Sequence, residues 1–414
     1  MAGTRTVRGT RDLLPAESRT LRLVEETAWR TARRWGYGEV ATPIFEFTEV
    51  FARTLGDTSD VVTKEMYTFE DRGGDSLTLR PENTAGIVRA FLSNSLAAQL
   101  PQRIFYRGPM FRYERPQKGR LRQFHQVGVE LLGAADPLGD VEVIALAHEF
   151  LAALGLADKI TLELNTLGSA QSRASYRACL VDYLQAHRSR LSPDSIARLE
   201  RNPLRILDSK DESDRAVIAG APVLQDSLDE ASRVFFAAVC EGLDALEIPH
   251  RMNQRLVRGL DYYCHTTFEF TTDALGAQGT VLAGGRYDSL VEQMGGPSTP
   301  GTGWAAGVER LMMLSAEDAP AERPIAMIAL GHEQSGAALR LARRLRLAGH
   351  TVMFGFASSL GKQMKWANRV GARLAIIVGA DEVDRAVATV RDMDAGAQEE
   401  VSLDLLEERL ARTA

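Results

Sequence analysis

Residues 105–130, FYRGPMFRYERPQKGRLRQFHQVGVE, contain two stretches of β-type residues that are separated by the charged, glycine-containing segment RPQKGRL. This pattern predicts two strands joined as a hairpin. Successive side chains of a strand point to opposite faces, so residues of one parity lie together. One parity is apolar, and we expect it to pack on a core; its residues are Phe111, Tyr113, Val127, Val129 and Leu131.

The opposite face of the predicted hairpin is polar. Its residues are Arg112, Glu114, Arg122, Phe124, Gln126, Gly128 and Glu130. Burying charged groups costs free energy unless they are paired or meet a ligand, so structural demands alone rarely place such residues among bulky strand residues. The pattern favours a polar surface that binds an anion. The alternative is a solvated pair of strands with alternating charges.

The pattern before the hairpin predicts a helix, two strands and a second helix. Apolar residues recur at helical spacing from residue 15 to residue 35, on a stripe of Leu21, Val24, Ala28, Ala32 and Trp35. Residues 40–44 predict a short strand. A further strand begins at Leu77 and gives way to a helix after Pro81. Glu82 lies at this junction, where it could contact a ligand or simply stabilise the start of the helix.

The second half of the chain has three further parts. Residues 160–250 are mostly helical in pattern, with one face formed by Tyr176, Leu180, Tyr183, Leu184 and His187. Strands return near residue 254, and two glycine-rich stretches follow. Residues 314–324, LSAEDAPAERP, have the composition of a linker. Beyond them, short apolar runs alternate with helical patterns, which predicts a small α/β domain.

Composition places the chain among intracellular globular proteins. Its 414 residues are 45% hydrophobic and 25% charged, enough for two or three domains. The three cysteines, Cys179, Cys240 and Cys264, lack the spacing of a disulfide framework or a zinc site. The sequence shows neither a signal peptide nor an apolar run long enough for a membrane span, so we expect a cytoplasmic protein. The net charge of −6 means that a nucleic acid could bind only at local basic patches.

The chemistry-bearing residues point to a nucleotide. The sequence has no P-loop, no HExxH and no hydrolase-type nucleophile motif. Four arginines instead lie in or beside strand, turn or glycine-rich segments: Arg112, Arg120, Arg258 and Arg310. A guanidinium can bind phosphate oxygens through two parallel hydrogen bonds, and Phe124 could stack on a base. Such a site would support phosphoryl or nucleotidyl transfer by positioning and charge stabilisation.

Several of these segments resemble motifs of the class II aminoacyl-tRNA synthetases, and specifically the histidyl-tRNA synthetase family. GYGEVATPIFE, FRYERPQKGRLRQFHQVGVE and GTGWAAGVERLMML resemble the three class motifs. LVRGLDYY at residues 256–263, AGGRYD at 283–288 and LRPENTA at 79–85 resemble signatures of the histidine family. Residues 359–379 resemble its anticodon-binding domain. The resemblance covers nearly the whole chain and is weak only from residue 381 onward.

The resemblance implies a role for each candidate residue. The catalytic residues would be Arg258, acting at the α-phosphate of ATP during activation, and Arg112, binding that phosphate and the amino-acid carboxylate. The ATP-binding residues would be Arg112, Glu114, Arg120, Phe124 and Arg310. The histidine-binding residues would be Glu82, Thr84, Arg112, Gln126, Glu130, Arg258, Tyr262, Tyr263 and Tyr287. ATP would bind with Mg²⁺, and no structural metal is expected.

The family also implies partners and an overall fold. The partners would be L-histidine, ATP, tRNA(His) and a second copy of the chain, with the loop 115–121 near the tRNA acceptor end. Lys362, Lys365, Arg369 and Arg373 could approach the anticodon, or form an ordinary solvated helix face. The fold would be an α+β catalytic domain built on an antiparallel sheet, with a helical insertion, followed by an α/β anticodon-binding domain. The expected boundaries are 1–158 and 254–315 for the catalytic domain, 159–253 for the insertion, 316–324 for the linker and 325–414 for the last domain.

Two other functions remain open at the level of sequence. The regulatory subunit of ATP phosphoribosyltransferase shares the fold and binds histidine without catalysis, but it generally lacks the anticodon domain and the catalytic motifs. An adenylate-forming ligase that does not use tRNA would also dispense with the last ~90 residues, which have the size of a separate small domain. Because the arginines and the C-terminal domain are present, the sequence favours the synthetase.

Overall fold

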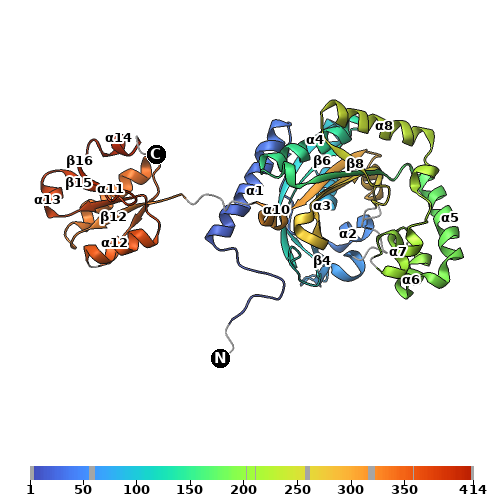
Figure 1. The fold of residues 1–414 in the computed structure, drawn as a ribbon, viewed down its shortest axis with the longest axis horizontal. Coiled ribbons are helices and arrows are strands. Elements are labelled where there is room, and N and C mark those ends of the chain that lie inside the picture. The colour runs from blue at the N-terminus through green and yellow to red at the C-terminus, as the bar shows by residue number, and fades with distance from the viewer. Residues whose placement is uncertain are drawn as a thin grey trace. The chain divides into compact units, whose positions relative to one another are not determined.

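The computed structural model describes residues 4–55, 61–201, 203–209, 211–256, 262–315, 322–357 and 359–411. The chain divides into two compact units, Met1–Ala319 and Pro320–Ala414 (Figure 1). Arg258 and most of the expected linker lie outside the described residues. Within the described residues, no helix combines the length and hydrophobicity needed to cross a lipid bilayer.

The first unit is built on a sheet of eight strands. In spatial order these are β1 (Gly38–Glu39), β5 (Gln102–Phe111), β6 (Gln123–Leu132), β11 (Gly301–Gly307), β10 (Thr280–Arg286), β9 (Cys264–Thr271), β7 (Thr161–Thr166) and β8 (His250–Met252). All neighbours from β5 to β7 are antiparallel, whereas the outermost pairs, β1 with β5 and β7 with β8, are parallel. The predicted fold class, with its mainly antiparallel catalytic sheet, is confirmed.

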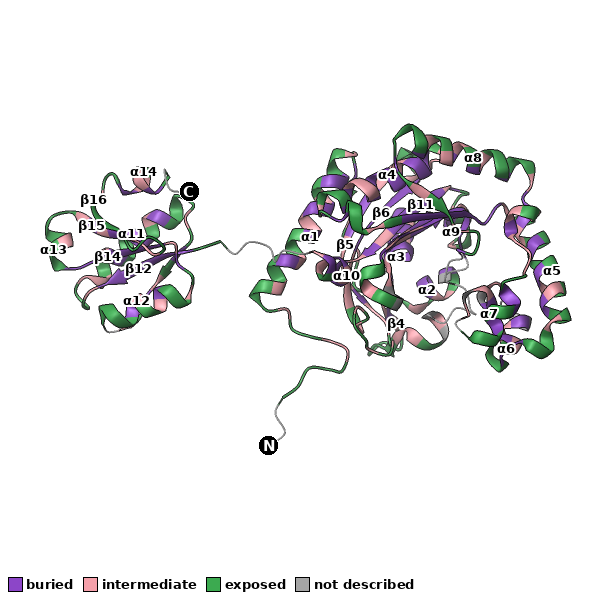
Figure 2. Cartoon of the chain, in the orientation of Figure 1, coloured by how far each residue is buried: buried purple, intermediate pink, exposed green. Residues whose placement is uncertain are grey.

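Helices pack over one face of this sheet. They are α1 (Pro15–Arg34), α4 (Leu138–Ala153), α8 (Glu230–Ala245) and α10 (Val308–Leu314). In Figure 2 the strands at the centre of this sheet are largely coloured as buried. Val127 and Val129 of β6 point into this core with Trp304 of β11, whose ring stacks on Phe150 at 5.9 Å. The predicted helix 15–35 is confirmed, with Val24, Ala28 and Ala32 buried.

A smaller sheet and three helices form a second layer. They are β2 (Phe45–Phe47), β4 (Ser76–Leu79), β3 (Tyr67–Glu70), α2 (Thr48–Leu55), α3 (Thr84–Ser93) and α9 (Leu290–Gln293). The predicted change from strand to helix around Pro81 is confirmed. The predicted strand at 40–44 is wrong, because strand structure ends at Glu39 and resumes only at Phe45. Pro43 has no N–H to donate, and the carbonyl oxygen of Thr42 accepts a hydrogen bond from Arg80 Nη1 (3.1 Å) instead of joining a ladder.

The segment between β7 and β8 is mostly helical. It contains α5 (Ala170–Ala186), α6 (Pro193–Arg201), α7 (Glu212–Ile218) and α8. Tyr176, Leu180 and Leu184 form the buried face of α5, as its spacing predicted. The strands at the two ends of this segment, β7 and β8, belong to the large sheet, so the sheet itself anchors the helices.

The second unit is a small α/β domain. Its strands, in spatial order, are β13 (Val352–Phe354), β12 (Ile325–Ala329), β14 (Leu374–Val378), β15 (Val387–Asp392) and β16 (Gln398–Ser402). Its helices are α11 (Ser335–Leu347), α12 (Leu360–Arg369), α13 (Ala380–Asp384) and α14 (Leu406–Ala411). The first three strands are parallel and the last two antiparallel. The prediction of an α/β domain is confirmed.

Candidate active site

The hairpin of β5 and β6 has the face that its sequence predicts. Phe124 pairs with Met110, Gln126 with Gly108 and Gly128 with Tyr106, which places Phe124, Gln126, Gly128 and Glu130 on one side. The N–H of Arg112 donates to the carbonyl oxygen of Arg122 (2.9 Å), which extends the same register beyond the strands.

The prediction for the apolar face is wrong at the end of the hairpin. Val127, Val129 and Leu131 are buried, but Phe111 is only half-buried and the side chain of Tyr113 is 53% exposed. The hairpin extends beyond the core at this point, so Tyr113 contacts Tyr67 (ring centroids 5.6 Å apart) and the guanidinium of Arg122 instead.

Glu130 is the most deeply buried carboxylate of this face. Its Oε1 accepts a hydrogen bond from Thr84 Oγ1 (2.7 Å), and its Oε2 accepts one from the Tyr287 hydroxyl. Burial raises the pKa of Glu130 to about 8, although its hydrogen bonds with Tyr287, Thr84 and Tyr106 oppose the shift. Glu130 is therefore a carboxyl group that can take up or release a proton near neutral pH, and we call the buried polar cluster around it the candidate pocket.

Glycines in the neighbouring strands provide the room for these side chains. A Cβ atom at Gly303 would overlap with Glu130 Oε2, and one at Gly301 would overlap with the Tyr287 ring. Within β6, a Cβ atom at Gly128 would overlap with the Tyr106 ring, which crosses over it from β5. The glycine-rich segments thus serve side-chain packing in the pocket, because any larger residue would displace a polar group of the site.

Glu82 and Gln126 lie at the edge of the same pocket. The carboxylate of Glu82 accepts hydrogen bonds from the N–H groups of Thr84 (2.5 Å) and Ala85 (3.0 Å) at the start of α3. The helix-stabilising role considered from the sequence is therefore present. Burial raises the pKa of Glu82. Among the described residues, none donates a hydrogen bond to the buried Oε1 of Gln126, which leaves an acceptor for a ligand.

Three tyrosines form one wall of the pocket. Tyr262, Tyr263 and Tyr287 are all buried; the Tyr262 ring lies 4.6 Å from that of Tyr263 and 5.8 Å from that of Tyr287, between centroids. Burial raises the pKa of Tyr262 and Tyr287 well above the ordinary value, and the nearby Glu130 adds to the shift. Tyr262 and Tyr287 therefore act as neutral hydroxyl groups near physiological pH.

The other described site residues form a cationic cluster at the loop end of the hairpin. The Arg112 guanidinium lies 5.3 Å from the Phe124 ring centroid, and its Nε donates to the carbonyl oxygen of Pro81 (2.8 Å). Glu114 lies 3.2 Å from Arg120 Nη1 and 3.9 Å from Arg112 Nη1. Arg310 donates from Nε to the carbonyl oxygen of Gly119 (3.2 Å). Burial lowers the pKa of Arg310, and repulsion by Arg120 and Arg112 lowers it further, so an anion bound here would relieve that repulsion.

The structure also places beside this site residues that the sequence analysis did not identify. Arg286 is fully buried beside Tyr287; its Nη2 lies 2.7 Å from Asp140 Oδ2, and its Nη1 donates to Asp288 Oδ1 (3.1 Å). Thr302 donates to the other oxygen of Asp140 (2.9 Å). The sequence offered one indication, Asp140 itself, a carboxylate in the first turn of a largely apolar helix.

A second missed contact joins the hairpin to α10. The N–H of His125 donates to Glu309 Oε2 (2.9 Å), and His125 Nδ1 lies 2.8 Å from Glu309 Oε1. Since Arg310 follows Glu309 directly, this contact fixes the start of the helix that carries Arg310 to the strand that carries Phe124. The pair positions two of the candidate nucleotide residues relative to each other.

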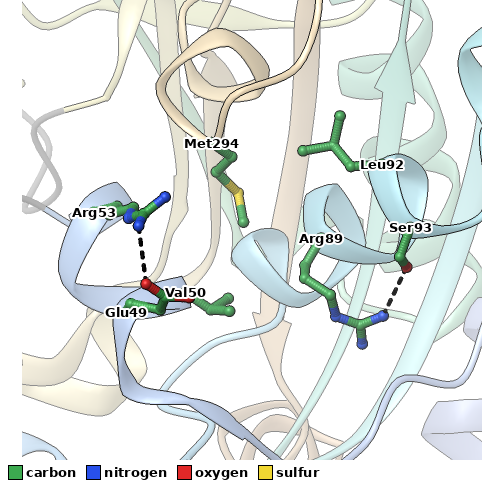
Figure 3. A pocket seen from close by; sticks show the side chains of 7 residues that line it. All are labelled: Glu49, Val50, Arg53, Arg89, Leu92, Ser93 and Met294. Carbon is green, nitrogen blue, oxygen red and sulfur yellow. Dashed lines mark hydrogen bonds and ion pairs between the residues drawn. The ribbon is translucent and has the colours of Figure 1, made fainter.

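A separate pocket of about 350 Å³ lies between α2, α3 and Met294 (Figure 3). In Figure 3 the side chain of Arg53 points to Glu49, with which it forms an ion pair (2.9 Å). Arg89 donates to Ser93 Oγ (3.2 Å) and also contacts Glu46. Both cations of this pocket are thus engaged within the protein, and none of the predicted site residues lines it.

Sequence comparison identifies the family of this chain. The profile described as Histidyl-tRNA synthetase matches residues 9–311, and that described as Anticodon binding domain matches residues 325–413. The chain belongs to the histidyl-tRNA synthetase family. The resemblance seen in its motifs is thereby confirmed.

Members of the histidyl-tRNA synthetase family resemble the chain over its full length. The histidine–tRNA ligase of Rhodospirillum rubrum is 64% identical over 413 residues, and that of Gluconacetobacter diazotrophicus is 54% identical over 414 residues; both comparisons cover 100% of each chain. The crystal structure of the histidyl-tRNA synthetase of S. aureus superimposes with a TM-score of 0.83 at 33% identity, covering 98% of this chain and 99% of that one.

Proposed function

We propose that this protein activates L-histidine with ATP to histidyl-adenylate and transfers the histidyl group to the 3′ end of tRNA(His). The observation that supports this most directly is the continuity of one hairpin face. Glu130, at the centre of a buried polar cluster, lies within β6, and the arginines around Glu114 lie in the segment that joins β5 to β6. The full-length similarity to histidine–tRNA ligases, including the C-terminal domain, favours this function over a regulatory subunit.

The pocket suits the imidazole of histidine. An imidazole has a polar nitrogen on each side of the ring, and Glu130, Tyr263 and Tyr287 offer a carboxylate and two phenols for them. An isostere without these nitrogens would leave buried groups unpaired, so the pocket can discriminate by ~10⁴ or more without an editing step. Gln126, Glu82 and Thr84 would contact the α-amino group, for which Gln126 Oε1 is an available acceptor. Tyr262, which packs against Tyr263 and Tyr287, would line the same side of the pocket.

The cationic cluster suits ATP. Arg112 would bind the α-phosphate together with the amino-acid carboxylate, and Arg120 would reach the outer phosphates. Adenine would stack between Phe124 and Arg310, with Glu114 accepting from its amino group. Mg²⁺ would bind together with ATP, coordinated by its phosphate oxygens. Among the described residues no group of three or more His, Cys, Asp or Glu could bind the ion alone, so phosphate oxygens would supply most of its ligands.

Activation would then proceed without a covalent protein intermediate. The histidine carboxylate attacks the α-phosphorus, its new bond to phosphorus forms as the bond to the bridging oxygen breaks, and pyrophosphate leaves with that electron pair. Arg112 and Arg258 stabilise the negative charge that builds on the α-phosphate oxygens. In the second step the terminal ribose hydroxyl of tRNA attacks the carbonyl carbon and AMP leaves.

Arg258 lies outside the described residues, so its role rests on the family resemblance alone. The variant Arg258→Ala tests that role. The variant should bind histidine nearly as well as the wild type but form adenylate at least ~100-fold more slowly, the usual loss when one charge-stabilising group is removed. Histidine binding can be measured by calorimetry and adenylate formation by ATP–pyrophosphate exchange. Exchange at the wild-type rate would contradict the role of Arg258.

The tRNA would contact both units. The loop 115–121 carries Arg115, Lys118 and Arg120, all exposed beside the arginine cluster, and would approach the acceptor end. In the second unit Lys362, Lys365 and Arg369 are exposed on α12, with Arg373 half-buried just beyond it, and would approach the anticodon. The residues from 381 onward have no assigned contact.

We also propose a homodimer, in the cytoplasm. Phe45, Phe47 and Phe69 share one face of the small sheet with Leu77 and Leu79, and these three phenylalanines are 46–53% exposed. An apolar sheet face of this kind is typical of a permanent interface, and a second copy would cover it. Sedimentation of Phe47→Glu would test this: the variant should sediment as a monomer if the face is the interface.

A further inference from the structure

The segment before α1 contacts the loop end of the β5–β6 hairpin. This arm, residues 4–14, appears in Figure 1 as the extended dark-blue chain that leads into α1. The carbonyl oxygen of Gly9 accepts a hydrogen bond from the N–H of Arg122 (2.7 Å). Arg11 Nη1 forms an ion pair with Glu17 of α1 (2.5 Å). The arm is thus tied to α1 at one point and to the hairpin at another.

Arg122 in turn contacts the hairpin end in three ways. Its guanidinium lies 3.9 Å from the ring centroid of Tyr113, and its Nε donates to the carbonyl oxygen of Glu114 (3.2 Å). Its own carbonyl oxygen accepts from the N–H of Arg112 (2.9 Å). These contacts matter because the regular strands end at Phe111 and begin again at Gln123, so Arg112 and Glu114 lie outside the ladder.

The contact with Arg122 requires glycine at position 9. The backbone of Gly9 has a φ of 87°, a left-handed conformation that residues with a side chain rarely adopt. A Cβ atom at this position would also lie 2.7 Å from Cγ and 2.9 Å from Cδ of Arg122, and 3.0 Å from Cγ of Pro116. Thr10 closes the turn by donating its N–H to the carbonyl oxygen of Val7 (2.9 Å). Any larger residue would push Arg122 away from Tyr113 and Glu114.

We propose that Gly9 and Arg122 are positioning residues: through them the N-terminal arm fixes the ATP-binding end of the hairpin. This rests on the proposed contact of Arg112 and Glu114 with ATP. The arm stabilises those two residues and the loop 115–121. It leaves the residues around the imidazole unaffected, because Glu130 lies within β6 and Tyr287 follows directly on β10.

Gly9→Ala tests the proposal against a matched control, Gly155→Ala. Gly155 also has a positive φ, of 70°, but a Cβ atom there would meet nothing within 4 Å, so this variant carries the backbone strain without the contact. In ATP–pyrophosphate exchange, Gly9→Ala should raise KM for ATP at least ~5-fold and raise KM for histidine by a smaller factor, because histidine meets the displaced residues only where its carboxylate contacts Arg112. General destabilisation does not produce this split. Gly155→Ala should leave both constants unchanged.

Trypsin cleavage gives a readout that does not depend on ATP binding. Lys118 and Arg120 are exposed in the loop, and fixing the hairpin end should slow cleavage there. Gly9→Ala should be cut at these two bonds several-fold faster than Gly155→Ala. Arg122→Leu should behave like Gly9→Ala, and Arg122→Lys, which retains the cation over Tyr113, should recover part of the effect.

The outcomes separate this proposal from the proposed function. Faster cleavage with an unchanged KM for ATP would mean that the arm fixes the loop but that Arg112 and Glu114 do not bind ATP as proposed, and this would overturn the positioning role. Cleavage and KM values equal to those of Gly155→Ala would overturn the arm's role altogether. Faster cleavage together with a rise in KM that is larger for ATP than for histidine would support it.

Discussion

The Tyr287 hydroxyl donates a hydrogen bond to Glu130, and each residue is only 1% exposed although 157 positions separate them in the chain. Tyr287 reaches the carboxylate from the end of β10, whereas Glu130 lies within β6. Since Thr84 donates to the other carboxylate oxygen, both oxygens are oriented before any ligand binds. Carboxylate oxygens oriented in this way would lose little conformational freedom on binding histidine as proposed.

Tyr287→Phe removes this donor and leaves the shape of the pocket almost unchanged. A buried carboxylate without one of its hydrogen bonds costs ~1–3 kcal/mol, so kcat/KM for histidine should fall about 10- to 100-fold. KM for ATP should remain near the wild-type value. Steady-state ATP–pyrophosphate exchange measures both constants. If KM for ATP rose by the same factor by which kcat/KM for histidine fell, the hydroxyl would not be specific to the histidine pocket.

The protonation of Glu130 should be visible in the pH dependence of stability. Its pKa is raised from 4.5 to about 8, so between these values the folded protein binds a proton that the unfolded chain has released. The resulting stabilisation is complete below pH 4.5 and is lost as the pH rises towards 8. Glutamine does not titrate. The melting temperature of Glu130→Gln, relative to that of the wild type, should therefore increase from pH 6 to pH 8, and a flat difference would contradict the shift.

Gly303→Ala should block the pocket. The new methyl group would overlap with Glu130 Oε2, so either the carboxylate or β11 must move. We expect kcat/KM for histidine to fall at least ~100-fold, which is typical of displacing a group that orients the substrate. The matched control is Gly38→Ala in β1 of the same sheet, where a Cβ atom meets nothing within 4 Å. The control should retain wild-type activity in the same exchange assay.

Asp140→Ala tests the buried ion pair behind the pocket. It leaves the fully buried Arg286 without its closest carboxylate, and removal of one partner from a buried pair typically costs ~3–5 kcal/mol. Urea unfolding should show a loss of this size. Glu49→Ala breaks the exposed pair with Arg53 and should change stability by less than ~0.5 kcal/mol. Similar losses for the two variants would mean that Asp140 contributes no more than a surface charge.

The polar face of the hairpin could be predicted from sequence because the side-chain period of a strand is two and needs no knowledge of distant contacts. The parity of Phe124, Gln126 and Glu130 is set within seven residues. The arginines could be recognised in the same way, from their local setting and from the family motifs. The roles of Arg112, Arg120, Arg258 and Arg310 remain predictions.

The parts that could not be predicted depend on residues far apart in the chain. Arg286 pairs with Asp140, 146 positions earlier. The local sequence around either residue does not identify the other as its partner. Tyr106 has the pattern of a core residue, yet its ring crosses Gly128 to reach Glu130. The strand predicted at 40–44 is absent because Arg80 binds the carbonyl oxygen of Thr42, again a long-range contact.

ATP–pyrophosphate exchange with the purified protein and each of the twenty amino acids in turn, followed by charging of bulk tRNA, tests the central claim most directly. We predict exchange with histidine alone, and charging of tRNA(His) with histidine. Binding of histidine without exchange, or exchange with a different amino acid, would contradict the assignment of this site.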